Sequence, residues 1–336
     1  MTSPEATGTR SPIRSAAVWR SSEIADPSEW TVVLTDDERQ EIADAVRAAR
    51  SAEVAVDTVD AASFPLPTLA GRAEQWSALL NRGRGFLLLR RFPVDLLDEA
   101  DTELAYIGLG THLGTPVGQD RDATVLGHVR DEGVERTHPG IRFYRTNERQ
   151  DFHADGADLV GLLCLHRARS GGESRIVSSA AIYNEILERR PDLLEVLYRP
   201  FHWDRNDEQS PGEDPFFAMP VLNDIAGTPR VFYIGWYIRD AQRHHEVPRL
   251  EPEQVEAMEL LEAIANDPAF HLEMDFEPGD VQFLNNARIL HAREAYEDEP
   301  DPAQRRHLLR LWLAAHHFTS VDEVLQGGIP RQRAEG

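Results

Sequence analysis

The sequence predicts a mainly β fold decorated by helices. Short apolar runs bounded by turn residues recur through the middle and the C-terminal part of the chain, as they do in strands. Helical periodicity is limited to the first third of the chain and to two later insertions. Strands in runs, with helices gathered at the front and in insertions, indicate a β core with helices packed around it.

Start and stop signals define the expected helices. A capping box, Thr35-x-x-Glu38, opens the first, Ser178 or Ser179 caps the fourth, and Pro252 opens the fifth. Together the expected helices cover 35–50, 69–80, 96–110, 178–189 and 252–265. Strands are expected over 85–90, 159–165, 175–177, 231–236 and 308–313, with turns at 113–116 and 170–174 and a mobile loop at 205–215.

Composition limits the domain organisation and the location. The 336 residues are 41% hydrophobic, enough for one domain over residues 26–336 behind a polar, flexible leader over 1–25. Apolar runs reach about seven residues, whereas about 20 are needed to cross a bilayer, so no membrane association is expected. Cys164 is the single cysteine and the first residues do not resemble a secretion signal. A reducing cytoplasm is therefore the expected location.

The net charge of −23 argues against a nucleic-acid partner, because binding phosphates requires a basic surface. A small-molecule partner is expected instead. Chance predicts about two His-x-Asp/Glu pairs from 13 His and 58 acidic residues, and the chain holds four, at 153/155, 202/204, 244/246 and 271/273. Only the first precedes an expected strand, a tight Gly-Gly turn and a second strand.

His153 and Asp155 have the chemistry of metal ligands. In an extended chain, residues i and i+2 project to one side, so both can bind one ion. A third ligand from a distant strand would complete the two-histidine, one-carboxylate set used by non-haem Fe(II) oxygenases, which leaves coordination positions open.

Two blocks carry a resemblance to a family. The first runs from His153-Ala154-Asp155-Gly156 to 171–174, and the second from 277–286 through His291 to 305–310. In this order and spacing they resemble the Fe(II)/2-oxoglutarate oxygenases of the taurine dioxygenase and clavaminate synthase superfamily, over about 85–317. The resemblance implies a double-stranded β-helix, or jelly-roll, core.

The resemblance also implies residue roles. His153, Asp155 and His291 would hold Fe(II). Arg306 would clamp the distal carboxylate of 2-oxoglutarate, and Arg310 would face the substrate or share that clamp. Ser174, where most relatives have threonine, would also contact that carboxylate. With O2, such an enzyme converts 2-oxoglutarate to succinate and CO2 while it hydroxylates, desaturates or cyclises at an unactivated C–H bond. Halogenation is disfavoured, since halogenating relatives lack the carboxylate ligand that Asp155 provides.

Other interpretations use the same residues. A zinc hydrolase could employ two histidines and an aspartate, and a non-catalytic jelly-roll binding protein is a third alternative. Ser174 could equally be a plain turn residue. The substrate pocket is expected to draw on Arg142, Tyr144, Arg145, Asn147, the 205–215 loop and Trp236 or Tyr237. Arginines there indicate a carboxylate- or sulfonate-bearing small molecule such as an amino acid derivative. His244 is expected to face solvent.

Overall fold

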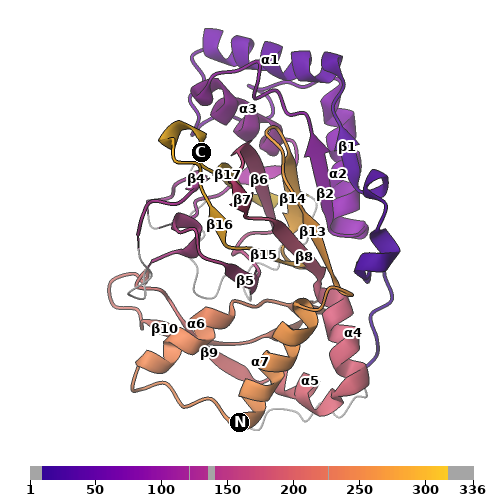
Figure 1. Ribbon diagram of the computed structural model, residues 1–336, viewed down its shortest axis with the longest axis vertical. Coiled ribbons are helices and arrows are strands. Elements are labelled where there is room, and N and C mark those ends of the chain that lie inside the picture. Colours follow the sequence, from indigo (N-terminus) through magenta and orange to yellow (C-terminus); the bar gives the residue numbers. More distant parts are fainter. Residues whose placement is uncertain (1–9, 121, 135–140, 226, 317–336) are drawn as a thin grey trace.

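The computed structural model describes residues 10–120, 122–134, 141–225 and 227–316, and it shows a mainly β protein with helices at both ends (Figure 1). The larger sheet has the strand order β1-β2-β14-β6-β17-β3, and β4 also pairs with β17. Its strands are β1 (Thr31–Val33), β2 (Phe86–Arg90), β3 (Gly114–Pro116), β4 (Leu126–Val129), β6 (Leu159–His166), β14 (Val281–Asn285) and β17 (His307–Ala315).

A second, four-stranded sheet has the order β13-β8-β15-β5 and is antiparallel throughout. Its strands are β5 (Gln150–His153), β8 (Ser174–Ser178), β13 (His271–Met274) and β15 (Ile289–Arg293). Three two-stranded ribbons complete the strands: β7 (Ser170–Gly171) with β16 (Tyr296–Glu297), β9 (Pro200–Asp204) with β10 (Phe216–Pro220), and β11 (Leu222–Ile225) with β12 (Thr228–Val231).

The helices form two groups at opposite ends of the molecule in Figure 1. The N-terminal group comprises α1 (Asp36–Ser51), α2 (Leu69–Arg82) and α3 (Glu99–Thr111). The other group comprises α4 (Ser179–Arg189), α5 (Pro191–Leu197), α6 (Gly235–Asp240) and α7 (Pro252–Ala265). Short 3-10 helices lie at Ser21–Ile24, Pro27–Glu29, Phe143–Arg145, Ala241–Arg243 and Pro302–Gln304. Within the described residues, none of these helices is long and apolar enough to cross a membrane.

Successive side chains along the strands of the larger sheet alternate between two buried regions, the core against the N-terminal helices and the space between the two sheets. On β2, Leu87 and Leu89 pack with the N-terminal helices, whereas Phe86 and Leu88 belong to a cluster that also contains side chains of the smaller sheet. The same alternation holds on β17, where Leu309 and its i+2 neighbours face the helices. The remaining side of each strand therefore faces the space between the two sheets. The functional side chains lie in that space.

Most sequence expectations for the elements are confirmed. The Thr35 capping box opens α1, Ser178 caps α4, and α7 begins at Pro252 and ends at Ala265. The turn expected at 113–116 is wrong, because Gly114–Pro116 pairs with the end of β17 as a strand. The strand expected over 231–236 is also wrong beyond Val231, since α6 begins at Gly235.

The expected loose leader is wrong from Arg10 onward. Trp19 and Ile24 are each 2% exposed and belong to the cluster between the sheets, and the Arg10 guanidinium pairs with the carboxylates of Glu195 and Asp224. Burial of these two large apolar side chains stabilises the packing of the segment against the sheets. Residues 1–9 and 317–336 of the expected leader and domain lie outside the described residues.

Candidate metal centre and the cavities around it

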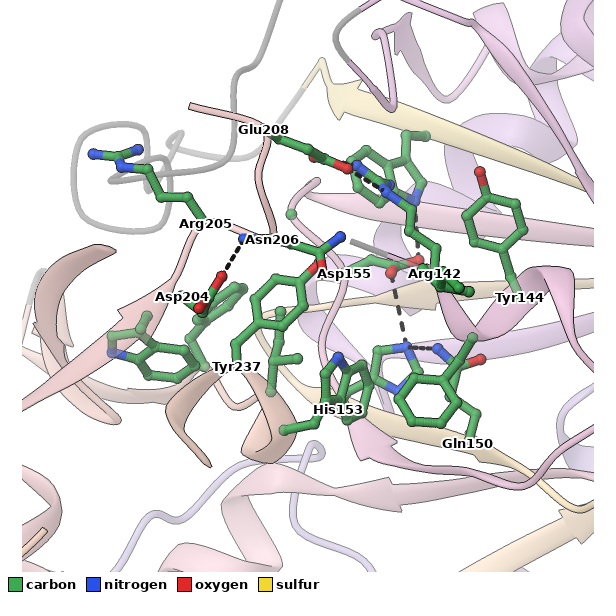
Figure 2. Close-up of a pocket in the computed structure, with 18 of the residues that line it drawn as sticks. Arg142, Tyr144, Gln150, His153, Asp155, Asp204, Arg205, Asn206, Glu208 and Tyr237 are labelled. Atoms are coloured by element: carbon green, nitrogen blue, oxygen red, sulfur yellow. Dashed lines mark hydrogen bonds and ion pairs between the residues drawn. The ribbon is translucent and has the colours of Figure 1, made fainter. Parts of the chain in front are cut away.

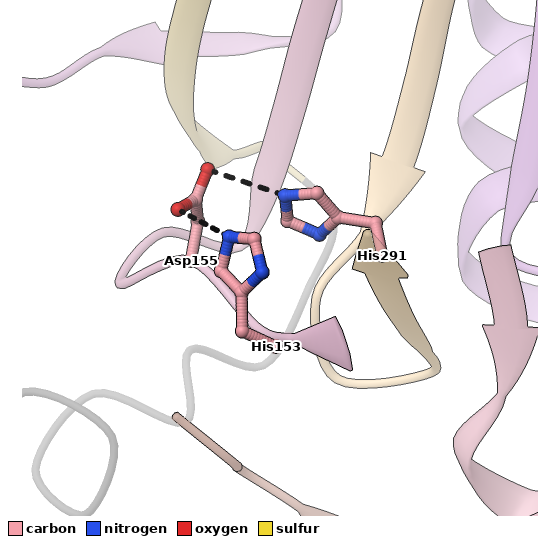
Figure 3. Close-up of side chains that lie close together, drawn as sticks. All are labelled: His153, Asp155 and His291. Carbon is pink, nitrogen blue, oxygen red and sulfur yellow. Dashed lines mark ion pairs between the residues drawn. The ribbon is translucent and has the colours of Figure 1, made fainter. Parts of the chain in front are cut away.

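Three potential metal ligands converge between the two sheets. His153 ends β5, Asp155 lies two residues later, and His291 is the middle residue of β15, paired with His153 across the sheet. One ligand atom from each residue lies within 4.8 Å of the others (Figure 3). The Nε2 atom of each histidine is 3.8 Å from a carboxylate oxygen of Asp155. Asp155 follows the strand rather than lying on it, so the expected i, i+2 strand geometry is wrong, although the side chains converge.

Neighbouring groups fix the orientation of these ligands. The Nδ1 atom of His153 lies 2.9 Å from the Asp151 carbonyl oxygen, which accepts a hydrogen bond from Nδ1–H, so that Nε2 carries the lone pair that a metal would bind. Trp312 Nε1–H donates to Asp155 Oδ2 at 2.9 Å, and the main-chain N–H of Asp155 donates to Asn286 Oδ1 at 3.0 Å. Trp312 was not anticipated as a support for the site, although its position two residues after Arg310 on one strand was a usable signal.

Electrostatics favours the protonation states that a divalent metal needs. Burial tends to raise the pKa of Asp155, but the charge of Arg310 and the two imidazoles outweigh it and lower that pKa to about 2. Burial, followed by the neighbouring His153, lowers the pKa of His291 to about 3, and burial also lowers the pKa of His153. At neutral pH the site therefore offers one carboxylate and two neutral imidazoles, a donor set that suits Fe(II).

A cationic cavity adjoins the two histidines. Ser174, Arg306, Arg310 and Arg293 line it together with His153 and His291, and no carboxylate is among its described lining residues. Arg306 is 4% exposed, its Nη1 has no hydrogen-bond partner among the described residues, and its Nη2 reaches only the Gly172 carbonyl at 3.4 Å. A buried guanidinium without a counter-charge is costly, so the cavity suits an organic anion such as 2-oxoglutarate.

The Gly-Gly turn makes room for Arg306. Gly171 and Gly172 have φ of 74° and 79°, values that favour glycine. A Cβ atom on Gly172 would lie 2.9 Å from Arg306 Nε, and one on Gly171 would lie 2.2 Å from the Ala295 carbonyl oxygen. Beyond the turn, the Ser174 hydroxyl lines the cavity and donates to Gln282 Oε1 at 3.1 Å. The turn therefore positions Arg306 and Ser174 on the same cavity.

Arg310 lies between this cavity and a second one. It lines both, its Nε donates to Gln119 Oε1 at 2.7 Å, and its Nη1 is 3.6 Å from Asp155 Oδ1. Its guanidinium also stacks 4.6 Å from the Tyr144 ring and 5.0 Å from that of Trp312. Arg310 is thus held beside the metal ligands, and its position on both cavities means that its contacts are not limited to the co-substrate.

The second cavity is lined by His153 and Asp155 (Figure 2). Arg142, Tyr144, Trp236 and Tyr237 line it as expected, and the 205–215 loop contributes its first residues, 205, 206 and 208. Arg142 Nε donates to Glu208 Oε1 at 2.7 Å, an ion pair that joins the two walls.

Two of the expected pocket residues lie elsewhere. Arg145 pairs with Glu132, and the Asn147 carbonyl accepts the main-chain N–H of Tyr296. Neither side chain is among the described lining residues of the second cavity. Arg145 is exposed, so an ion pair at the surface satisfies its charge without any ligand.

A buried ion cluster supports the wall of this cavity and was missed from the sequence. Asp204, 1% exposed, accepts from Arg243 Nε at 2.6 Å and lies 2.9 Å from His244 Nε2. The expectation that His244 faces solvent is therefore wrong. The buried carboxylate needs a counter-charge, and Arg243 supplies it from the segment after α6, with the His244 ring beside it.

Comparison with known proteins identifies the family. Residues 49–312 match the family model described as taurine catabolism dioxygenase TauD, TfdA family. FR-33289 synthase of Streptomyces rubellomurinus is 33% identical over 310 residues, which span 90% of this chain and 91% of that protein. A uridine-5'-phosphate dioxygenase from an Amycolatopsis species is 27% identical over 279 residues, 76% of this chain and 91% of that protein.

The chain belongs to the TauD/TfdA dioxygenase family. It is a non-haem iron, 2-oxoglutarate-dependent dioxygenase. Solved structures with a similar fold include an asparagine oxygenase with Fe(II), hydroxyasparagine and succinate, with a TM-score of 0.66 and 18% identity over 85% of this chain and 93% of that one. Another is the non-haem iron oxygenase OrfP with iron and α-ketoglutaric acid, with a TM-score of 0.62 and 16% identity over 84% and 94%.

Proposed function

We propose that this dioxygenase oxidises an unactivated C–H bond of a small, anionic, polar molecule, with hydroxylation as the default outcome and succinate and CO2 as co-products. His153, Asp155 and His291 would hold the iron, and the described chain from Arg10 onward would form one catalytic domain with a double-stranded β-helix core. The observation that carries the proposal is the pair of cavities that share His153 and Arg310, one lined also by Asp155 and the other by His291.

Each cavity has its own role in the proposal. Iron with O2 and 2-oxoglutarate supplies the oxidising chemistry, and the protein positions the reactants and excludes water. In the cationic cavity, Arg306 would receive the distal carboxylate of 2-oxoglutarate, with the Ser174 hydroxyl beside it. For Ser174 to donate to that carboxylate, the Gln282 amide must turn so that it donates to the serine oxygen.

The second cavity supports an anionic substrate. Arg310 lines it 3.6 Å from Asp155, Arg142 lines it as a guanidinium paired with Glu208, and Trp236 and Tyr237 supply aromatic surface. One relative is named for a phosphate-bearing nucleotide, and two structural neighbours are named or crystallised with amino acids or their hydroxylated products. A carboxylate, or another acidic group on an amino acid-like molecule, is therefore the substrate class we propose. The zinc hydrolase and non-catalytic alternatives are not favoured by family membership.

The triad is tested by substituting each ligand with alanine. Each variant should lose Fe(II) binding under anaerobic conditions and lose substrate-dependent succinate release, while its circular dichroism spectrum stays that of the wild type. His245→Ala, a substitution at a 91% exposed imidazole outside the site, is the control and should retain both. Normal Fe(II) binding and succinate release by any one ligand variant would show that the assignment is wrong. A panel of amino acids, sulfonates and phosphate esters then identifies the substrate.

A further inference from the structure

A second arginine faces the co-substrate cavity. Arg293 lies two residues after His291 on β15, so the two side chains project from the same side of the strand. Its Cα pairs with that of Ser174 on the neighbouring strand β8, which places those two side chains next to each other. Both also line the cavity that contains Arg306. Geometry alone therefore directs Arg293 toward the site where the co-substrate binds.

Arg293 is buried and forms no ion pair within the part of the chain that the structure describes. Arg293 is 6% exposed, and its Nε and Nη1 atoms have no hydrogen-bond partner among the described residues. Its Nη2 donates to the Glu148 carbonyl and lies 3.5 Å from that of Phe143. These main-chain contacts hold the side chain in place, but they use one nitrogen of three. The other two remain available to an anion in the cavity.

The guanidinium groups of Arg293 and Arg306 lie close to each other, both beside the Tyr296 ring, and both residues border the cavity. Their guanidinium carbons lie 5.0 Å and 4.9 Å from the ring centroid of Tyr296. The nearby Asp298 carboxylate accepts the main-chain N–H of Arg306 at 2.8 Å. Two like charges held together in a buried cavity are relieved by an anion that both can contact.

We propose that Arg293 is a second binding residue for the dicarboxylate co-substrate, which acts with Arg306 on its distal carboxylate. This inference rests on the proposed function of the same cavity. Two guanidiniums favour a 2-oxo acid with a distal carboxylate over one without it, because a neutral chain end leaves both charges unpaired. Arg293 is thus a residue that determines co-substrate specificity.

The test measures binding rather than turnover. Anaerobic Fe(II)-loaded protein is titrated calorimetrically with 2-oxoglutarate and with 2-oxobutyrate, which lacks the distal carboxylate. Arg293→Met should weaken 2-oxoglutarate binding by roughly 10-fold or more and leave 2-oxobutyrate and Fe(II) binding within about 3-fold of wild type. Arg306→Met should do the same to a greater extent. Arg169→Met, at a neighbouring exposed arginine paired with Glu297, is the matched control and should change neither affinity.

Three outcomes are distinguishable. Wild-type 2-oxoglutarate affinity in Arg293→Met, together with a loss in Arg306→Met, would overturn the role of Arg293 and leave the proposed function intact. Equal losses for 2-oxoglutarate and 2-oxobutyrate would also overturn it, because they would indicate a structural role. Failure of the wild type to bind 2-oxoglutarate would overturn the proposed function itself. If the methionine variant does not fold, Arg293→Gln removes the charge, keeps hydrogen-bonding capacity and should show the same selective loss.

Discussion

Trp312→Phe tests how the protein holds the Asp155 carboxylate. The indole Nε1–H donates to Asp155 Oδ2 at 2.9 Å in the space between the sheets. Phenylalanine keeps most of the apolar surface and deletes only this donor. The main-chain N–H of Asp155 would still donate to Asn286 Oδ1, and Arg310 Nη1 would still lie 3.6 Å from the other carboxylate oxygen. The substitution should therefore loosen the carboxylate oxygen while the fold remains.

The expected magnitude follows from the charge of the acceptor. A hydrogen bond to a charged group contributes about 1.5–3 kcal/mol, and loss of a residue that supports a metal ligand costs about 10- to 100-fold in metal affinity. These two ranges overlap near 2 kcal/mol, or about 30-fold. The same donor helps to lower the pKa of Asp155, so the variant should also need a somewhat higher pH for full metal binding. Anaerobic Fe(II) titration at several pH values measures both effects.

Trp30→Phe is the matched control. Its indole also donates a hydrogen bond in a buried setting, at 3.0 Å to the Ile24 carbonyl, but it touches no residue of the site. Both variants should lose about 1 kcal/mol or more of unfolding free energy, and only Trp312→Phe should lose metal affinity. Equal metal affinities in the two variants would refute the reasoning that this hydrogen bond orients the ligand.

Two further predictions follow. Arg310→Met should raise the KM for the prime substrate more than the KM for 2-oxoglutarate, since Arg310 lines both cavities whereas Arg306 lines only the cationic one and would still bind the co-substrate; steady-state kinetics with each varied in turn decides this. Burial, then the charges of His128 and Arg130, lower the pKa of His307 to about 4 from 6.5. The unfolded chain therefore binds the extra proton first, and stability falls as pH drops below about 6.5. Melting curves of His307→Gln should fall less steeply over pH 6.5–4, and equal slopes would contradict this.

The parts of the site that were predictable depend on local sequence pattern. The His153-Ala154-Asp155 motif and the Gly-Gly turn are short segments whose chemistry can be recognised in the chain, and the structure places Arg306 and Ser174 on one cavity. The start of helix α7 was predictable to the residue, because proline at the first helical position marks it.

The parts that were not predictable depend on contacts between distant segments. Asp204 and His244 are 40 residues apart, and their pairing is set by how the chain after α6 packs against β9. The segment 232–236 has the β-branched and aromatic residues of a strand. Among the described residues, its main chain forms only a hydrogen bond from Phe232 to Val221 and an isolated bridge between Ile234 and His153 before the chain turns into α6. In such places tertiary packing outweighs local preference. Arg293 was overlooked for a similar reason, since its burial depends on Tyr296 and on the 143–148 segment.

The charge of the interior explains why an acidic protein can bind an acidic co-substrate. The whole chain carries −23, but the cavity beside the ligand cluster is lined by three arginines and, among its described lining residues, by no carboxylate. Asp155 next to it offsets one of those charges, and a divalent metal adds two more. The positive charge of each guanidinium disfavours binding of the metal cation and favours binding of the 2-oxoglutarate dianion. The metal and the co-substrate therefore strengthen each other's binding. Burial between the sheets keeps this local field unscreened, which the surface charge cannot do.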